Sequence, residues 1–166
     1  KTDSPQNFEL LYQWKNGYAI FSGAAAYGEY YVQMYRYNSD GIGKVEDISI
    51  SKVNLLSGDY KEIKAMEDNA EKLSDMTFDY STNTMYAVGF ELGDTFLYSI
   101  DLQTGTLTKG PLLQTNAEKQ TIATLAATYD GRLYGLNMKG ILFKINKETG
   151  NLTRVMDSKI PLRYNQ

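Results

Sequence analysis

Ile100–Thr108 (IDLQTGTLT) is the segment that decides the fold, because versions of it return at Val53–Lys61 (VNLLSGDYK) and at Ile145–Thr153 (INKETGNLT). Each copy has an aliphatic residue, then Asn or Asp, and later a Ser or Thr followed by Gly. An Asn or Asp side chain accepts hydrogen bonds from backbone amides further along the chain, which starts a turn. Gly supplies the positive φ that closes the turn. The segment therefore predicts a β-hairpin.

The hairpin belongs to a longer repeat, because its glycines, Gly58, Gly105 and Gly150, lie 47 and 45 residues apart. Alternating apolar residues and turn signals predict four short strands in each of the last two units. These strands are expected at 74–79, 84–90, 95–101 and 106–112, and again at 122–128, 132–137, 141–146 and 151–156. A period near 45 with four strands is typical of a propeller blade. We expect an all-β fold of β-propeller blades, four-stranded antiparallel repeats that form part of a larger propeller.

The whole chain is interpreted as one propeller domain or propeller fragment. The expected units are about 8–72, 73–120 and 121–160, with the start of a next unit at 161–166. The first unit is less regular than the others. In it, Gly17–Phe21 resembles the second strand of a blade, and we interpret 27–47 as an extra or lengthened hairpin inserted in this blade.

The repeat resembles a known family from about residue 48 to the end of the chain. Asp75–Tyr86, Leu97–Gly105 and Tyr129–Gly135 are similar to bacterial β-propeller repeats of the seven-bladed, lactonase-like and quinoprotein-like type. The chain departs from related repeats in lacking a WD dipeptide and a double Gly, and its one Trp, Trp14, cannot form the tryptophan signature of quinoprotein dehydrogenases. The resemblance implies a propeller fold and export, and it carries over no catalytic residue, because a fold does not define a function.

The expected location is extracellular, periplasmic or on the outer cell surface, with lipid anchoring of the precursor as one form of it. This expectation follows from the resemblance and from the first residue, Lys1, which suggests a mature or trimmed form of a longer precursor. The missing blades are then expected from the rest of the parent chain.

The composition restricts the chemistry. The 166 residues include no Cys and no His, which excludes disulfides, thiolate metal sites, Cys nucleophiles and His-dependent catalysis. The formal net charge is −3, so we expect no nucleic-acid partner. No apolar run approaches the ~20 residues that cross a bilayer, so we expect no transmembrane segment. We also expect no cofactor and no bound metal.

Two groups of residues are candidates for ligand binding. The first comprises Tyr31, Tyr35 and Tyr37, which alternation places on one strand face. Tyrosine rings offer a large contact area with few rotatable bonds, which suits sugars and protein partners. The alternative is that these rings pack between sheets. By contrast, Tyr86, Tyr98, Tyr129 and Tyr134 recur with the repeat, so we expect them to pack within the blades.

The second group comprises Glu91, Asp94, Glu118 and Asn137, which lie in or beside predicted loops. The loops most expected to bind a ligand are 89–95, 116–121 and 137–140, because binding residues are commonly found on loops that a rigid scaffold positions.

Three functions remain open, one of which is a purely structural role in which this segment pairs with another chain to complete a ring. The first of the other two is a non-catalytic binding or scaffold module at a bacterial surface, whose ligand is a glycan or a protein. The alternative to it is a lactonase-like or hydrolase-like enzyme with a metal held by carboxylates in the central channel. A thermal-shift screen with divalent cations separates these two, because a bound metal stabilises the folded state.

Overall fold

The computed structural model describes residues 10, 12–13, 17–37 and 45–157. These residues form twelve strands in three separate four-stranded antiparallel sheets. No helix in the described part of the chain is long and apolar enough to cross a membrane.

Each sheet uses four consecutive strands in chain order. The first sheet consists of β1 (Tyr18–Ala26), β2 (Glu29–Tyr37), β3 (Val45–Asn54) and β4 (Tyr60–Ala65). The second sheet consists of β5 (Leu73–Asp79), β6 (Thr84–Glu91), β7 (Asp94–Ile100) and β8 (Leu107–Leu112). The third sheet consists of β9 (Ile122–Ala127), β10 (Leu133–Asn137), β11 (Ile141–Ile145) and β12 (Leu152–Asp157). The prediction of four-stranded antiparallel units is confirmed, and the expected strands of the last two units agree with the observed ones to within one residue.

The interpretation of the first unit is wrong. Gly17–Phe21 was expected in a second strand, but Tyr18–Ala26 is the first strand of its sheet. The stretch interpreted as an inserted hairpin instead supplies the regular second strand and the start of the third, β2 and β3, which pair with each other. The error arose because nine residues of mostly aromatic and apolar type in β2 give no turn signal. Residues 38–44 lie outside the described part of the chain.

The repeated turn has the same geometry in all three sheets. Asn54, Asp101 and Asn146 each accept two backbone hydrogen bonds through Oδ1, from the residues two and three positions on, at 2.8–3.0 Å. The following glycines have φ values of 74°, 68° and 73° and donate their N–H to the carbonyl of the same Asn or Asp. The Asx turn predicted from the sequence is confirmed at each position.

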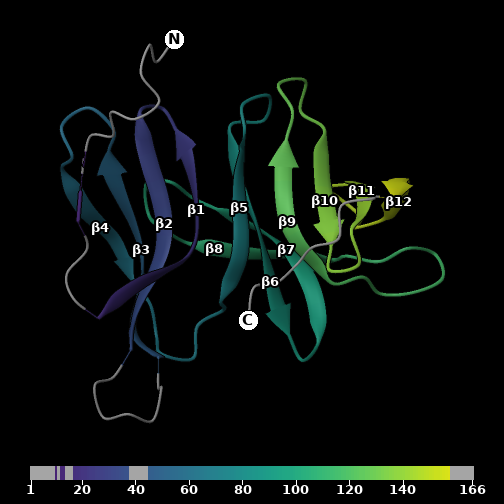
Figure 1. Ribbon diagram of the computed structural model, residues 1–166, viewed down its shortest axis with the longest axis horizontal. Helices are drawn as coiled ribbons and strands as arrows, with labels where there is room; N and C mark the ends of the chain where they lie inside the picture. Colours follow the sequence, from purple (N-terminus) through teal and green to yellow (C-terminus); the bar gives the residue numbers. More distant parts are fainter. Residues whose placement is uncertain (1–9, 11, 14–16, 38–44, 158–166) are drawn as a thin grey trace.

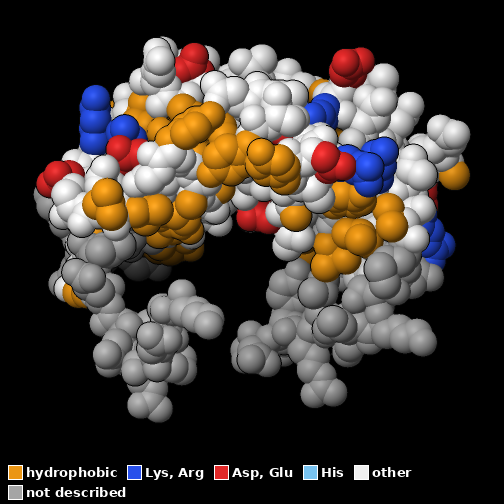
Figure 2. Space-filling view, turned by 90° about the horizontal axis from the view of Figure 1, so that it is seen from above, with side chains coloured by type: hydrophobic (Ala, Val, Ile, Leu, Met, Phe, Trp, Pro, Cys, Tyr) orange, Lys and Arg blue, Asp and Glu red, His pale blue; other side chains and the backbone are white. Residues whose placement is uncertain are grey.

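The first strands of the three sheets, β1, β5 and β9, lie side by side in the middle of the molecule, and the sheets extend outward from them (Figure 1). Seen from the end that carries the β1–β2 and β5–β6 turns, the described residues form an arch (Figure 2). This is the arrangement of consecutive propeller blades around an axis. Two apolar clusters fill the spaces between neighbouring sheets, one for each interface.

Polar side chains also join neighbouring sheets. Asp75 and Thr77 on β5 accept hydrogen bonds from the backbone N–H groups of Leu125 and Ala127 on β9, at 2.7 and 3.0 Å. Gln33 on β2 is fully buried and bonds both the carbonyl of Glu71 and the N–H of Leu73, each at 2.7 Å. Buried backbone groups need such partners, so these contacts fix the spacing of the sheets.

Candidate functional site

A groove lies between the first and the second sheet and is lined by residues of both. We call it the seam groove; its volume is about 830 Å³. Residues of the β1–β2, β5–β6 and β7–β8 turns contribute to its lining. The lining is mainly polar and consists of Tyr27, Tyr31, Lys52, Lys61, Ile63, Asn83, Thr84, Ser99, Ile100, Asp101, Leu102, Gln103 and Thr108.

An exposed tyrosine, Tyr27, stands at the groove. It lies in the β1–β2 turn with φ of 52°, a conformation that bulky residues rarely adopt. Its ring contacts Phe78 and Tyr80 edge-on, with centroids 5.2 and 5.9 Å away, and its hydroxyl donates to Oδ1 of Asn83. The side chain nevertheless remains 61% exposed. The second sheet therefore holds Tyr27 in place while most of its surface stays accessible.

The first sheet contributes two lysines to the groove. Lys52 on β3 and Lys61 on β4 are directly opposite each other in the strand pairing. The Lys52 ammonium lies 3.3 Å from Oε1 of Glu29 and 5.9 Å from the centre of the Tyr31 ring. Tyr31 itself is 5% exposed, and burial raises the pKa of its hydroxyl. Among the described residues, Lys61 has no ion pair.

The acidic residue of the lining forms hydrogen bonds with the backbone of its own turn. Asp101 accepts the backbone N–H groups of Thr104 and Gln103, and these hydrogen bonds lower the pKa of its carboxyl. Asp101 thus stays ionised while its Oδ1 atom accepts the turn amides, and a ligand in the groove would meet its charge beside those of the two lysines.

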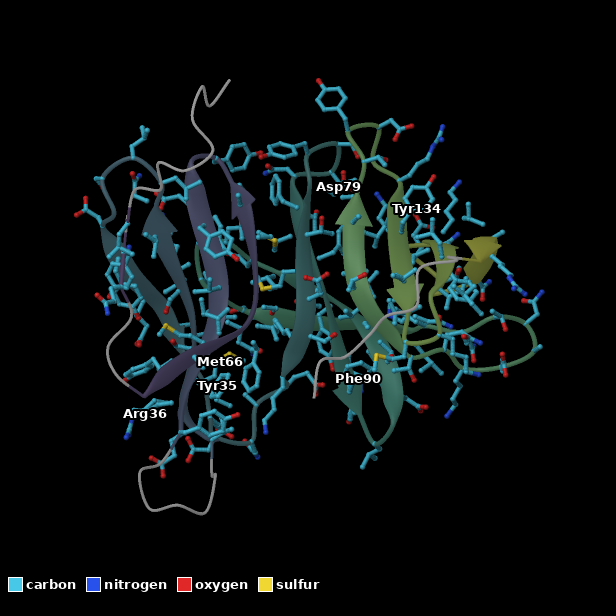
Figure 3. The ribbon with its side chains drawn as sticks, viewed as in Figure 1. Tyr35, Arg36, Met66, Asp79, Phe90 and Tyr134 are labelled. Atoms are coloured by element: carbon cyan, nitrogen blue, oxygen red, sulfur yellow. The ribbon has the colours of Figure 1, made fainter. Side chains whose placement is uncertain are left out.

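The equivalent position between the second and third sheets is filled. There, Lys147 extends from the β11–β12 turn and bonds Oδ2 of Asp79 at 2.7 Å and the carbonyl of Gly131 at 2.9 Å. Its ammonium lies 5.7 Å from the centre of the Tyr86 ring. Figure 3 shows Asp79 at the upper end of the molecule, where the second and third sheets meet. We call this interface the closed seam.

Register explains the difference between the seams. Tyr31 occupies in the first sheet the position of Tyr86 in the second, because their strands pair in the same register with the preceding strands. The same alignment matches Ala26 with Asp79, and the repeated turn matches Leu102 with Lys147. The seam between the first and second sheets therefore lacks both partners of the buried ion pair: Ala26 and Leu102 belong to the apolar packing there, and Leu102 also lines the groove.

Of the residues predicted from the sequence, Tyr31 lines the seam groove, whereas Tyr35 and Tyr37 lie at the opposite end of the first sheet. Tyr35 stacks on Phe21 with centroids 3.9 Å apart and donates a hydrogen bond to the Tyr37 hydroxyl at 3.2 Å. Burial, followed by the contact with Tyr37, raises the pKa of Tyr35 to about 12. Figure 3 shows Tyr35 beside Arg36 at this lower end. The structure thus separates Tyr31 from Tyr35 and Tyr37, which stay in contact with each other.

The predicted polar residues gather partly at the loops around β9 and β10. Glu118 and Asn137 line a small pocket of about 170 Å³. Asn137 donates to Oε1 of Gln120 at 3.0 Å, and its Oδ1 accepts the N–H groups of Lys139 and Ile141, so its side chain caps the β10–β11 turn.

Asp94 joins the same region through an ion pair with Lys119 at 2.7 Å, which links the 89–95 and 116–121 loops. Glu91 instead pairs with Lys109. Ligand binding by these residues stays a prediction. Within the described ranges, no group of three or more Asp or Glu residues is placed to hold a metal ion.

The sequence missed Tyr27, Lys52 and Lys61. Tyr27 was hidden because the first unit was divided wrongly. The sequence does show that the turn position after the Asn or Asp differs between the repeats: it is Leu55 and Leu102 in the first two and Lys147 in the third. The expectation for the blade-repeating tyrosines holds for Tyr98, which is 5% exposed, and fails for Tyr129, which is 92% exposed on the β9–β10 turn.

No family model and no curated protein matches the chain. Among solved structures, a protein of unknown function from Bacteroides thetaiotaomicron VPI-5482 is 15% identical with a TM-score of 0.53. The match covers 85% of this chain and 32% of that protein. Dipeptidyl peptidase 4 of Porphyromonas gingivalis is 9% identical with a TM-score of 0.50, covering 82% and 24%. An oligogalacturonate lyase in complex with manganese is 12% identical with a TM-score of 0.48, covering 94% and 58%.

The chain therefore spans 58% or less of the length of these three structures. The likeness to propeller structures shows the fold: three four-stranded sheets that resemble propeller blades.

Proposed function

We propose that this chain is a non-catalytic binding module of a β-propeller and that it binds its ligand in the seam groove. The observation that carries the proposal is the seam groove itself: a polar groove of about 830 Å³ with an exposed tyrosine lies between the first two sheets, where the ion pair of Lys147 and Asp79 has no counterpart. The volume lies within the range of ligand sites, and a polar lining with one exposed aromatic ring suits a polar ligand.

A glycan suits the groove better than an apolar ligand. Turn residues with polar side chains, such as Asn83 and Gln103, line it, and the exposed ring of Tyr27 stands beside them. Polar groups match sugar hydroxyls, and a tyrosine ring matches the apolar face of a sugar. A protein segment is the alternative ligand, because tyrosine also anchors peptides.

The proposal is tested with an array of glycans and peptides. Tyr27→Ala should lower retention of the bound ligand at least tenfold, whereas Tyr129→Ala should leave it unchanged, because Tyr129 is the exposed tyrosine of the equivalent turn in the third sheet. Equal losses in both variants, or no retained ligand at all, would refute the proposal. Stabilisation of the protein by divalent cations would instead favour the metal-dependent hydrolase.

We also propose that further blades follow the third sheet in a larger, exported propeller, as the sequence resemblance implies. Val88 and Leu97 of the second sheet are buried against the third. In the third sheet the matching positions are Leu136 and Leu142, which are only partly buried. An apolar face at the same register supports another sheet packing there.

This second proposal is tested by comparing this chain with its parent product. Leu142→Arg should destabilise the parent by about 2–3 kcal/mol more than it destabilises the 166-residue chain, because a buried leucine position tolerates no charge. Equal effects on the two proteins in urea unfolding would contradict it. Protease added to intact cells tests the location, because it should cleave the parent protein only if that protein lies on the cell surface.

A further inference from the structure

The two lysines of the seam groove form an unusual pair. Lys52 and Lys61 are direct cross-strand partners, and both line the groove. Like charges directly opposite each other on neighbouring strands destabilise a sheet. The first sheet therefore carries a local electrostatic cost on the surface that faces the groove.

The other two sheets avoid this cost at the same register. In the second sheet the matching pair is Ser99 with Thr108, and in the third it is Lys144 with Thr153. The repeat thus accepts one lysine or none at this pair of positions. A second lysine appears only in the sheet whose seam is open.

Two carboxylates near the lysines, Glu29 and Asp101, formally balance their charges, but neither forms an ion pair with Lys61 among the described residues. Glu29 pairs with Lys52 at 3.3 Å and also accepts a hydrogen bond from Asn54. Asp101 directs Oδ1 to its own turn amides. Lys61 is left without an ion pair among the described residues, which gives the groove an attraction for an anion although the whole chain has a net charge of −3.

We propose that the seam groove binds an acidic oligosaccharide, with Lys52 and Lys61 contacting its carboxylate or sulfate groups and Tyr27 contacting a sugar ring. This inference rests on the proposed binding function and adds the charge of the ligand to it. An anion between the lysines removes their repulsion, and charge-assisted hydrogen bonds are stronger than neutral ones. The exposed ring beside the lysines favours an acidic sugar over an inorganic anion.

The test compares oligosaccharides that differ only in charge. Calorimetry with β-1,4-linked oligomannuronate and with β-1,4-linked mannan oligosaccharide of equal length isolates the carboxylate, and an array of uronate and sulfated glycans beside neutral ones extends the comparison. Acidic members should bind at least tenfold more tightly, and raising the salt from 50 to 500 mM should weaken them, because ionic attraction is screened. Lys52→Gln and Lys61→Gln should each weaken binding about fivefold or more.

Lys144→Gln is the matched control, because Lys144 holds in the third sheet the register of Lys52 in the first; it should not change binding. Equal binding of neutral and acidic glycans, unaffected by the lysine variants, would overturn the acidic ligand and leave the binding function standing. If inorganic phosphate binds as tightly as the acidic glycans, the proposal that the groove recognises a sugar ring is overturned. Failure of all glycans and peptides would overturn both proposals.

Discussion

The two seams between the sheets have the same strand arrangement but different side chains. In the closed seam, a lysine from the following sheet lies over a tyrosine and pairs with an aspartate that is 1% exposed. In the open seam, the tyrosine remains as Tyr31, but Ala26 and Leu102 replace the ion pair, and the cation over the ring, Lys52, comes from the same sheet. A repeat can therefore keep its backbone while a few side chains decide whether an interface between sheets is sealed or open.

Removing the cation of the closed seam should produce the largest effect. Lys147→Met should cost about 3–5 kcal/mol of unfolding free energy, because the charge of Asp79 is left buried without its partner. Urea unfolding measures the loss. Lys109→Met is the control: its pair with Glu91 is exposed, so the cost should stay below about 1 kcal/mol. Similar losses in both variants would show that the closed seam is not held by its ion pair.

A methyl group at the turn glycine of the third sheet should have the next largest effect. Gly150 has φ of 73°, and a Cβ there would collide with the Leu112 carbonyl oxygen in the second sheet. Gly150→Ala should cost about 3 kcal/mol, more than the ~1–2 kcal/mol of a left-handed residue alone. Gly93→Ala is the control and should cost only the ~1–2 kcal/mol of a left-handed residue. Gly93 has φ of 89°, and no atom lies within 4 Å of a Cβ placed there. Equal melting temperatures would contradict close contact at the closed seam.

Introducing the ion pair of the closed seam into the open seam tests whether the two positions are equivalent. Ala26→Asp alone should be destabilising, because Ala26 is 1% exposed and a buried carboxylate needs a partner. Adding Leu102→Lys should recover about 1–3 kcal/mol in a double-mutant cycle and should abolish ligand binding by filling the groove. A coupling energy near zero would mean that the two seams are not equivalent.

The smallest predicted effect is the loss of stability of the closed seam in acid, which should be slight above about pH 4. Burial alone would raise the pKa of Asp79, but hydrogen bonds from Lys147, Ser81 and Thr82 lower it well below its usual range. A folded-state pKa below the unfolded value of about 3.9 stabilises the protein above that pH, and the stabilisation is lost as the pH falls toward the folded value.

Unfolding free energies of the wild type and of Asp79→Asn should therefore converge as the pH falls from 7 to 3. The comparison of the two proteins removes the contribution of Asp75, whose pKa is raised by burial in both. A constant difference across this pH range would contradict the assignment of the shift to Asp79.

The sequence by itself determined the blade repeat. The Asx turns at Asn54, Asp101 and Asn146 are local, because a side chain reaches only the backbone of its own turn, so nine residues are enough to specify them. Alternation between such turns then gave the strands of the second and third sheets. Where the turn signal was absent, as in β2, the division of the unit failed.

Only the tertiary structure decided which seam is open. Tyr27, Lys52 and Asn83 meet in the groove although they lie in different strands and turns of two sheets. How Ala26 and Leu102 pack depends on the register of one sheet against the next, and on the spacing of the sheets that the hydrogen bonds of Asp75, Thr77 and Gln33 maintain. Contacts between sheets join residues far apart in the chain, and no local pattern of residue types specifies them.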